Sequence, residues 1–315
     1  MAATRTRSEP RDFVWVAAGA AVLLALVATV LSHRVEQRRA AQIALRSHRL
    51  ELVDRMRVDL AAESEAEKSA VLAITDEDSQ RFADQARASR AELDRGRAEL
   101  DRLLAAPRVE AGEREPLDRF SQALTDLERV DDEVLSLAVQ NTNLKASRLA
   151  FGPGADLLTQ IDAALADAVD RSSTAGNVAR ATALADDARI RALRIEAILP
   201  RHIAEESDSK MDEMEAAMAS EDQGVRADLR DLAEAGPPVH ASDVETALAL
   251  WNELGDLRKQ IVALSRANTN VRSLNLSLSR KRAAMLACQE ALAALRQRIE
   301  QEPAGTTRFA PASPR

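Results

Sequence analysis

Residues 250–299 read LWNELGDLRKQIVALSRANTNVRSLNLSLSRKRAAMLACQEALAALRQRI, with core-type positions at steps of four and three. The first series is Leu250, Leu254, Leu257, Ile261, Leu264, Asn268, Val271, Leu274 and Leu278. After a Lys-Arg pair the series continues with Met285, Cys288, Leu292, Leu295 and Ile299. A sustained seven-residue repeat requires packing against other helices, as in a coiled coil or helical bundle. The pattern predicts an all-α fold with long, coiled-coil-like helices.

The composition of the 315 residues points the same way. Aromatic residues make up only 2%, which argues against a β-sandwich or barrel and against an enzyme pocket lined by aromatic rings. Charged residues at 30% and apolar residues at 46% are typical of long helices. Because Cys288 is the single cysteine, an internal disulfide and a multi-cysteine metal site are excluded.

Breaker residues divide the chain into expected helices. These helices span residues 32–74, 79–106, 117–151, 155–171, 177–219, 222–235 and 242–300. We expect Gly152-Pro153-Gly154 to end one of them as a turn, and Pro200 to kink another. The last residues, 302–315, are expected to be a disordered tail.

An internal duplication organises the body of the chain. Residues 127–165 align without gaps to residues 254–292, at an offset of 127. Both segments contain Asn-Thr-Asn, at positions 141–143 and 268–270.

A second, upstream similarity has a different offset. AAESEAEK (61–68) resembles IAEESDSK (203–210) at an offset of 142, which predicts a hairpin shorter by fifteen residues in the second copy. The sequence therefore predicts two tandem antiparallel helical-bundle modules, residues 33–172 and 173–301.

The N-terminal region carries a candidate membrane segment. Phe13–Leu31 has nineteen residues without a charge, and a helix of that length spans about 28 Å. Arg5, Arg7 and Arg11 precede it, so a cleaved signal peptide is an alternative. The apolar run is longer than a usual signal peptide core and no clear A-x-A site follows. We therefore favour a transmembrane helix over residues 13–32 after a basic tail, residues 1–12.

Charge bears on orientation and on partners. Residues 1–50 carry a balance of +5, so residues 51–315 must carry −13 of the total of −8. An acidic body is repelled by phosphate backbones, which argues against nucleic-acid binding. Counting basic residues on both flanks favours a cytoplasmic body, whereas large domains translocate largely regardless of charge. We favour an extracytoplasmic body anchored in the inner (plasma) membrane by a single pass.

Two quoted segments carry a family resemblance. EVLSLAVQNTNLKASRL (133–149) and IVALSRANTNVRSLNLSLSRKR (261–282), behind a membrane helix, resemble the extracytoplasmic four-helix-bundle sensor domain of methyl-accepting chemotaxis proteins. The resemblance covers most of residues 13–300. It implies binding of small ligands or ligand-loaded binding proteins and signalling through the membrane. The sequence shows no second membrane helix, HAMP-like linker or methylation hairpin, so only the input half is expected.

Asn141 and Asn268 are the candidate site residues, because each occupies a heptad position that calls for an apolar side chain. One interpretation is that they set helix register or cap a helix break. The other is that they form a polar layer lining a small ligand cavity. Lys145 and Arg272, four residues further on, either bind a carboxylate or are solvated charges at the rim.

The pattern excludes several kinds of chemistry. We find no phosphate loop, nucleophile elbow, dinucleotide fingerprint or histidine cluster, so we expect no enzyme, cofactor or metal. The leading hypothesis is a membrane-anchored sensory protein that functions as a homodimer or with a partner receptor or envelope protein. The alternative is a structural or adaptor protein of the cell envelope.

Overall fold

The computed structural model describes residues 10–105, 111–170, 173–174 and 176–301, without the side chains of residues 10–22, 24, 25 and 111. Within these ranges the chain forms no β-strand, and a single isolated backbone bridge joins Val169 and Val239. The expected all-α fold is confirmed. The expected tail, residues 302–315, and most of the basic tail, residues 1–12, lie outside the described residues.

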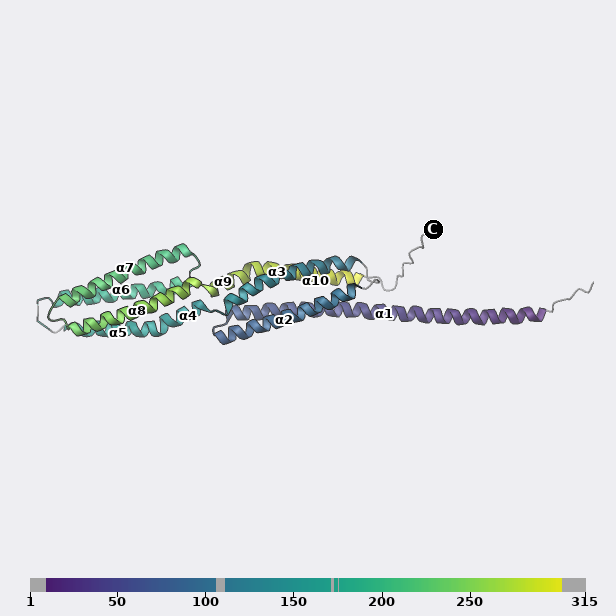
Figure 1. Ribbon diagram of the computed structural model, residues 1–315, viewed down its shortest axis with the longest axis horizontal. Helices are drawn as coiled ribbons and strands as arrows, with labels where there is room; N and C mark the ends of the chain where they lie inside the picture. The colour runs from purple at the N-terminus through teal and green to yellow at the C-terminus, as the bar shows by residue number, and fades with distance from the viewer. Residues whose placement is uncertain (1–9, 106–110, 171–172, 175, 302–315) are drawn as a thin grey trace, which may run out of the picture. The chain divides into compact units, whose positions relative to one another are not determined.

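Helices of very different length make up the chain (Figure 1). The first elements are α1 (Pro10–Leu72), α2 (Asp76–Leu104), η1 (Ala111–Glu113), α3 (Arg114–Ala138), α4 (Thr142–Leu149), η2 (Ala150–Gly154) and α5 (Ala155–Asp167). They are followed by α6 (Val178–Ala204), α7 (Asp208–Glu234), α8 (Ala241–Ala267), α9 (Thr269–Leu276), η3 (Ser277–Lys281) and α10 (Arg282–Gln301). The short element η1 is a 3₁₀ turn, whereas η2 and η3 are π-helical turns.

The duplicated segment shows the same series of breaks in both copies. Helices α3 and α8 are each followed by an asparagine with left-handed backbone, then by a helix of eight residues and a π-turn of five. Each feature in the second copy lies 127 residues after its counterpart. The sequence alignment at this offset is therefore also a structural equivalence: α3, α4, η2 and α5 correspond to α8, α9, η3 and α10.

The tips of the two helical hairpins show that the second predicted alignment is wrong. In α1–α2 the hydroxyl of Thr75 accepts a hydrogen bond from the N–H of Asp78, and in α6–α7 Ser207 accepts one from Lys210. These equivalent caps are 132 residues apart, not 142. Residues 61–68 lie inside α1, whereas residues 203–210 contain the α6–α7 break. The second hairpin is shorter by five residues rather than fifteen.

The break between α6 and α7 also corrects the expected helix over residues 177–219. Glu205 adopts an extended backbone, with φ −78° and ψ 140°, and its carboxylate accepts hydrogen bonds from the N–H groups of Glu206 and Ser207. Such local side-chain bonds compete with the helix ladder and end it. Pro200 lies within α6 and does not end the helix.

Gly152-Pro153-Gly154 does not form the expected turn. The chain passes through η2 directly into α5, with Pro153 inside the π-turn. A proline ring clashes with the carbonyl four residues earlier in a regular α-helix, and the wider π-turn relieves this clash. The expected uninterrupted helix over residues 242–300 is likewise broken, at Asn268 and at η3.

The chain divides into two compact units. Unit 1 comprises the residues up to 60, residues 91–122 and the residues from 287 onward. Unit 2 comprises residues 61–90 and 123–286. Each unit therefore combines residues from both expected modules, 33–172 and 173–301.

Unit 2 contains a helical bundle. Helices α6 and α7 pack against each other, α5 packs against α6 and α8, and α7 packs against α8 (Figure 1). Their shared core is mostly aliphatic and includes one large ring, that of Trp251. The α5 helix belongs to the first copy of the duplication, whereas α6, α7 and α8 belong to the second.

Unit 1 has its own core, built from parts of α1, α2, α3 and α10. Its buried side chains include Leu52, Val53, Met56, Leu93, Leu100, Leu117, Phe120, Cys288, Leu292, Leu295 and Ile299. Two hydrogen bonds join α10 to α1. Arg296 Nη1 of α10 donates to Asp54 Oδ1 of α1 at 2.9 Å, and Arg46 Nε of α1 donates to the carbonyl of Ile299 in α10 at 2.9 Å. Thus α10 of the second copy packs with α1 of the first. The two copies exchange their last helices.

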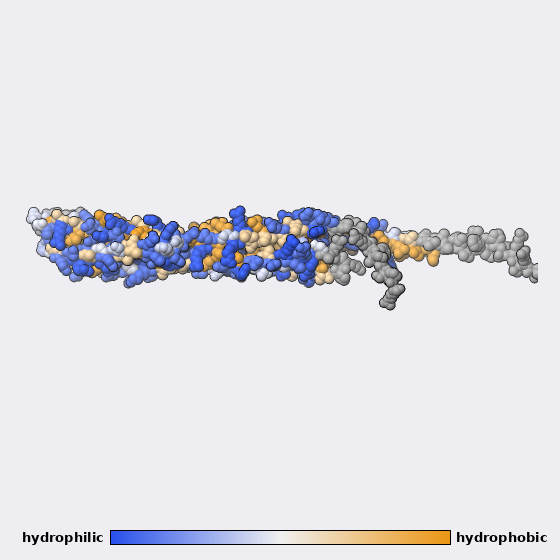
Figure 2. Space-filling model, turned by 90° about the horizontal axis from the view of Figure 1, so that it is seen from above, coloured by the Kyte–Doolittle hydropathy of each residue, from blue (hydrophilic) through white to orange (hydrophobic). Residues whose placement is uncertain are grey.

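The first described side chains of α1 include several exposed apolar ones. Leu23, Leu26, Val27, Val30 and Leu31 are all exposed, and Figure 2 shows hydrophobic residues on the described start of this helix. Within the described residues, no helix meets the length and hydropathy that a membrane crossing requires. Most side chains of the expected transmembrane segment, residues 13–32, lie outside the described part of the chain.

Candidate functional site

The two asparagines singled out from the sequence occupy equivalent helix breaks. Asn141 and Asn268 both have φ 52°, a left-handed backbone that residues with a β-carbon rarely adopt. Asparagine is among the residues that tolerate it best. Both side chains are buried. The structure therefore places both residues in the protein interior, within unit 2.

The residues after these asparagines cap each other's helices. The first N–H groups of an α-helix have no partner within that helix. In α4 the N–H of Thr142 donates to Thr269 Oγ1 at 3.2 Å, and the N–H of Asn143 donates to Asn270 Oδ1 at 3.1 Å. The reciprocal bonds from Thr269 to Thr142 Oγ1 and from Asn270 to Asn143 Oδ1 measure 3.1 and 3.2 Å. Each copy thus supplies the N-terminal caps of the other. We call residues 141–143 and 268–270 the Asn-Thr-Asn joint.

The side-chain amides complete this joint. Asn143 Nδ2 donates to Asn268 Oδ1 at 2.8 Å, and Asn270 Nδ2 donates to Asn141 Oδ1 at 3.0 Å. The amide of Asn141 also donates to Asp76, and that of Asn268 donates to the carbonyl of Glu205. All four amides therefore donate to protein atoms. A buried amide without a partner costs about 1–3 kcal/mol, so these reciprocal bonds stabilise one register between the copies.

The two candidate cations beside the joint have different surroundings. Lys145 Nζ lies 3.2 Å from Asp76 Oδ2 and donates to the carbonyl of Gln140 at 2.9 Å. Burial would raise the pKa of Asp76, but hydrogen bonds from Asn141 and Lys145 outweigh it and lower that pKa. Arg272 is exposed. Lys145 thus joins the edge of the joint, and the structure does not bring Arg272 to it.

A stripe of small residues crosses the joint, and the sequence interpretation missed it. In the first copy, buried residues follow each other at steps of four: Val134, Ala138, Thr142, Ala146, Ala150 and Gly154. In the second copy the stripe is Ile261, Ser265, Thr269, Ser273, Ser277 and Lys281. Steps of four form the helix ridges that interlock at close crossings. Leu274 and Leu278, expected in the core from the heptad, are exposed because the stripe replaces the heptad here.

A buried histidine lies next to the stripe. His202 Nδ1 lies 2.8 Å from Ser265 Oγ, and its Nε2 lies 2.9 Å from Glu215 Oε1. Arg266 also donates to Glu215, at 2.6 Å. Burial would raise the pKa of Glu215, but the hydrogen bonds from Arg266 and His202 lower it.

The stripe of the second copy ends in a buried cluster of charges. Lys281, the last residue of η3, places Nζ 2.7 Å from Asp131, 2.8 Å from Glu63 and 3.0 Å from Glu67. All four side chains are at most 3% exposed. Arg90 adds a longer contact, 3.8 Å to Asp131. We call these residues the lysine layer.

Three carboxylates share one buried ammonium in this layer, and this affects their protonation. Burial raises the pKa of Glu63 to about 8; Lys281 opposes that shift and Asp131 adds to it. Burial would lower the pKa of Lys281, but the carboxylates of Glu63, Asp131 and Glu67 together raise it. The cluster therefore favours a charged lysine beside a carboxyl group that holds its proton near neutral pH.

The equivalent layer at η2 contains different side chains. Gly154 stands at the position of Lys281, and Arg258 stands at the position of Asp131. Arg258 Nη2 donates to Asp222 Oδ1 at 2.6 Å, and its guanidinium carbon lies 5.2 Å from the Trp251 ring centre. We call these residues the arginine layer. At the hairpin offset of 132, Asp222 stands at the position of Arg90. The ion pair between Arg90 and Asp131 in the lysine layer therefore corresponds to the pair between Asp222 and Arg258 here, with the two charges exchanged.

No family model, curated protein or solved structure matches this chain.

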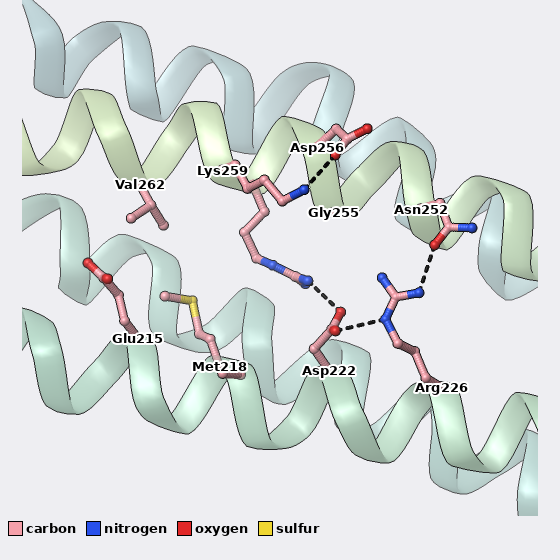
Figure 3. A pocket seen from close by; sticks show the side chains of 11 residues that line it. Glu215, Met218, Asp222, Arg226, Asn252, Gly255, Asp256, Lys259 and Val262 are labelled. Atoms are coloured by element: carbon pink, nitrogen blue, oxygen red, sulfur yellow. Dashed lines mark hydrogen bonds and ion pairs between the residues drawn. The ribbon is translucent and has the colours of Figure 1, made fainter.

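An open groove runs between α7 and α8 beside the arginine layer (Figure 3). It has a volume of about 540 Å³ and is floored by Met218, Gly255 and Val262. Asp222 of α7 accepts a hydrogen bond from Arg226 of the same helix at 2.9 Å and another across the groove from Arg258 of α8 at 2.6 Å. Burial would raise the pKa of Asp222, but these two bonds lower it. The groove thus offers a wide surface whose main ion pairs are internal.

Metal chemistry finds no support in the described part of the chain. No group of three histidine, cysteine, aspartate or glutamate side chains there is arranged to hold an ion. The joint fixes the two copies to each other, and the layers on either side contain ionisable groups in a close-packed helical core.

Proposed function

We propose that this protein is a membrane-anchored sensory protein in which a helical body, built from two copies that exchange helices, receives a signal outside the cytoplasm. Residues 13–32 would anchor it in the inner membrane by a single pass, and the bundles would function by contact rather than by catalysis. The observation that carries the proposal is the continuity of α1, which runs without a break from Pro10 to Leu72. One helix therefore includes both the apolar segment and a wall of the helical body.

The exposure of α1 supports the anchor. The apolar side chains of Leu23, Leu26, Val27, Val30 and Leu31 are exposed, as lipid-facing side chains are. Burial of such side chains in a bilayer stabilises the inserted helix, whereas each charge at its centre opposes insertion by about 2.5–3.5 kcal/mol.

The joint supports a role in transmission. Two packed elements with alternative discrete arrangements are the usual basis of a conformational signal. The exchange of α5 and α10 makes each copy part of the other copy's bundle. A change in the helix packing of one copy would therefore affect the other copy through the joint.

Membrane association is tested by alkaline washing of membranes from cells that make the full chain. The protein should remain in the pellet, and a Leu23→Arg/Leu26→Arg variant should move to the supernatant. Val58→Arg is the matched control, since Val58 is an exposed apolar residue of α1 outside the segment. A wild-type protein that washes off freely would disprove the anchor. A reporter fused after residue 315 then gives the orientation, and a cytoplasmic reporter would contradict sensing outside the cell.

A structural or adaptor role in the envelope is the second candidate. It is favoured by the joint, whose amides all bond within the protein, and by the internally paired charges of the groove. Crosslinking in cells would then recover one constant protein partner, regardless of added small molecules. Thermal unfolding of the full chain with amino acids, organic acids and envelope proteins separates the two functions, because only the sensor should be stabilised by a ligand.

A further inference from the structure

A small cavity lies inside the helical bundle of unit 2, among α6, α8 and η2. The cavity has a volume of about 10 Å³, which leaves room for a single small occupant. Its wall is mostly aliphatic. The lining side chains are Ala150, Ala192, Ile195, Glu196, Leu199, Trp251, Leu254, Arg258 and Ile261, with Gly154.

Two hydrogen-bond donors on this wall have no acceptor within the protein. Trp251 is 1% exposed, and its indole Nε1 is buried without a partner. Arg258 Nη1 is also buried without a partner. Buried donors in native proteins are nearly always paired with protein, water or a bound group, and an unpaired one costs about 1–3 kcal/mol. The wall therefore calls for an acceptor.

The guanidinium group is held in place by its other contacts. Arg258 Nη2 donates to Asp222 at 2.6 Å, and the Trp251 ring lies 5.2 Å away. The arginine is therefore preorganised, with a charged donor remaining at Nη1. Hydrogen bonds from an ionised donor are roughly twice as strong as those between neutral groups.

The equivalent place in the lysine layer suggests what kind of group is missing. There, Lys281 is the last residue of the π-turn, and its ammonium group supplies the positive charge that pairs with the buried carboxylates of Glu63 and Asp131. In the arginine layer the same position is Gly154, which has no side chain. Arg258 stands here in place of Asp131, and although its Nη2 is paired with Asp222, its Nη1 remains a cationic donor without an acceptor. An acceptor from solution that carries negative charge complements it.

We propose that this cavity binds a small monovalent anion of halide size, with chloride as the physiological candidate. A halide is a pure acceptor, so it pairs both donors and needs no acceptor from an aliphatic wall. Glu196 is the one acidic residue on the wall, and burial raises the pKa of its carboxyl group above the ordinary value. The site deepens the proposed function by naming a ligand class, and its sensory role rests on that function. The binding of the anion does not depend on the protein being a sensor.

The test uses the full chain in lipid nanodiscs with Trp15→Phe, which leaves Trp251 as the only tryptophan of two. Sodium chloride, bromide and iodide are titrated against sodium gluconate at constant ionic strength. Trp251 fluorescence should change saturably, and Tm should rise by roughly 2–4 °C per tenfold increase in chloride above its dissociation constant. A site of this size should prefer chloride to iodide. No saturable effect, or a preference for iodide as at exposed cationic surfaces, would mean a water-filled cavity and would overturn the proposal.

Four variants locate the site. Trp251→Phe keeps a ring but removes the donor, and should weaken the chloride effect on Tm at least tenfold. Ala192→Val fills the cavity and should abolish that effect, whereas Ala185→Val, a matched change at a buried position of α6 away from the cavity, should retain it. Glu196→Gln removes the nearby negative charge and should tighten binding several-fold. Equal chloride responses in all four would contradict the assignment. If the protein binds chloride but is released from membranes by the alkaline wash, the anion site stands and the proposed membrane-anchored sensor is disproved.

Discussion

The lysine layer and the arginine layer occupy equivalent places in the two copies of the duplication, but their buried charges are arranged with opposite polarity. Around Lys281 three carboxylates surround one ammonium. Around Gly154 a single arginine faces tryptophan and aliphatic side chains, and its ion pair to Asp222 has the reverse polarity. The backbone is the same in both, with an asparagine break followed by a π-turn. The joint and the stripe of small residues therefore set the backbone, and the polarity of the layers is free to differ.

Removal of the ammonium from the lysine layer should have the largest effect. Lys281→Met leaves three buried carboxylates without their cation, so the free energy of unfolding should fall by about 3–5 kcal/mol. Lys259→Met, at an exposed lysine paired only with Asp256, should change it by less than about 0.5 kcal/mol. Denaturant unfolding followed by circular dichroism measures both. Similar small losses in the two variants would show that the lysine layer is not a buried charge cluster.

Disruption of the joint should come next. Asn268→Ala places alanine in a left-handed conformation, which costs about 1–2 kcal/mol, and removes partners of Asn143 and Glu205. The same unfolding experiment should show a loss of about 2–4 kcal/mol in total. Asn275→Ala, at an exposed position of α9, is the control and should be nearly neutral. A neutral Asn268→Ala would mean that the break does not depend on asparagine.

The lysine layer should also make the free energy of unfolding depend on pH between about 4.5 and 8. The pKa of Glu63 is about 8 in the folded protein, above its ordinary value of 4.5, so the folded state holds a proton that the unfolded state loses. This contribution is fully present below pH 4.5 and is lost as the pH rises to about 8. Glu63→Gln mimics the protonated acid, so at pH 8.5 it should be more stable than the wild type by about 1–3 kcal/mol.

The two proteins should converge near pH 5. Glu65→Gln, at an exposed position of the same helix, is the control and should follow the wild-type profile. A Glu63→Gln profile parallel to that of the wild type would show that Glu63 loses its proton at an ordinary pH.

The smallest effects should come from the cations beside the joint. Lys145 has a half-exposed ion pair with Asp76, and Arg272 is exposed. Alanine at either position should lower the free energy of unfolding by less than about 0.5 kcal/mol. A larger loss at Arg272 would reveal a contact that the exposed side chain does not make in this structure.

The helical fold could be predicted because it depends on periodicity. The heptad over residues 285–299 is buried as expected, and the gapless alignment at offset 127 corresponds to equivalent elements. Short similarities carry less information, since the resemblance of residues 61–68 to 203–210 places a helix interior against a helix break. Composition alone cannot distinguish these two environments.

The joint was predicted only in part. The heptad indicated that Asn141 and Asn268 are core positions, but not that each copy caps the other, because such bonds depend on three-dimensional pairing. The signal for the close crossing was present in the steps of four from Ala138 to Gly154, which were not considered beside the heptad. Partners such as Lys281 and Glu63 are more than two hundred residues apart, and no local pattern links them.

The reciprocal joint is tested most directly by amide hydrogen exchange of the full chain. The N–H groups of Thr142 and Thr269 begin their helices, where exchange is ordinarily fast because no helical partner exists. Here both should be protected, and Thr269→Ala should accelerate exchange at Thr142, more than a hundred residues away, because its acceptor is removed. Fast exchange at both threonines in the wild type, or unchanged exchange at Thr142 in the variant, would contradict the pairing of the two copies.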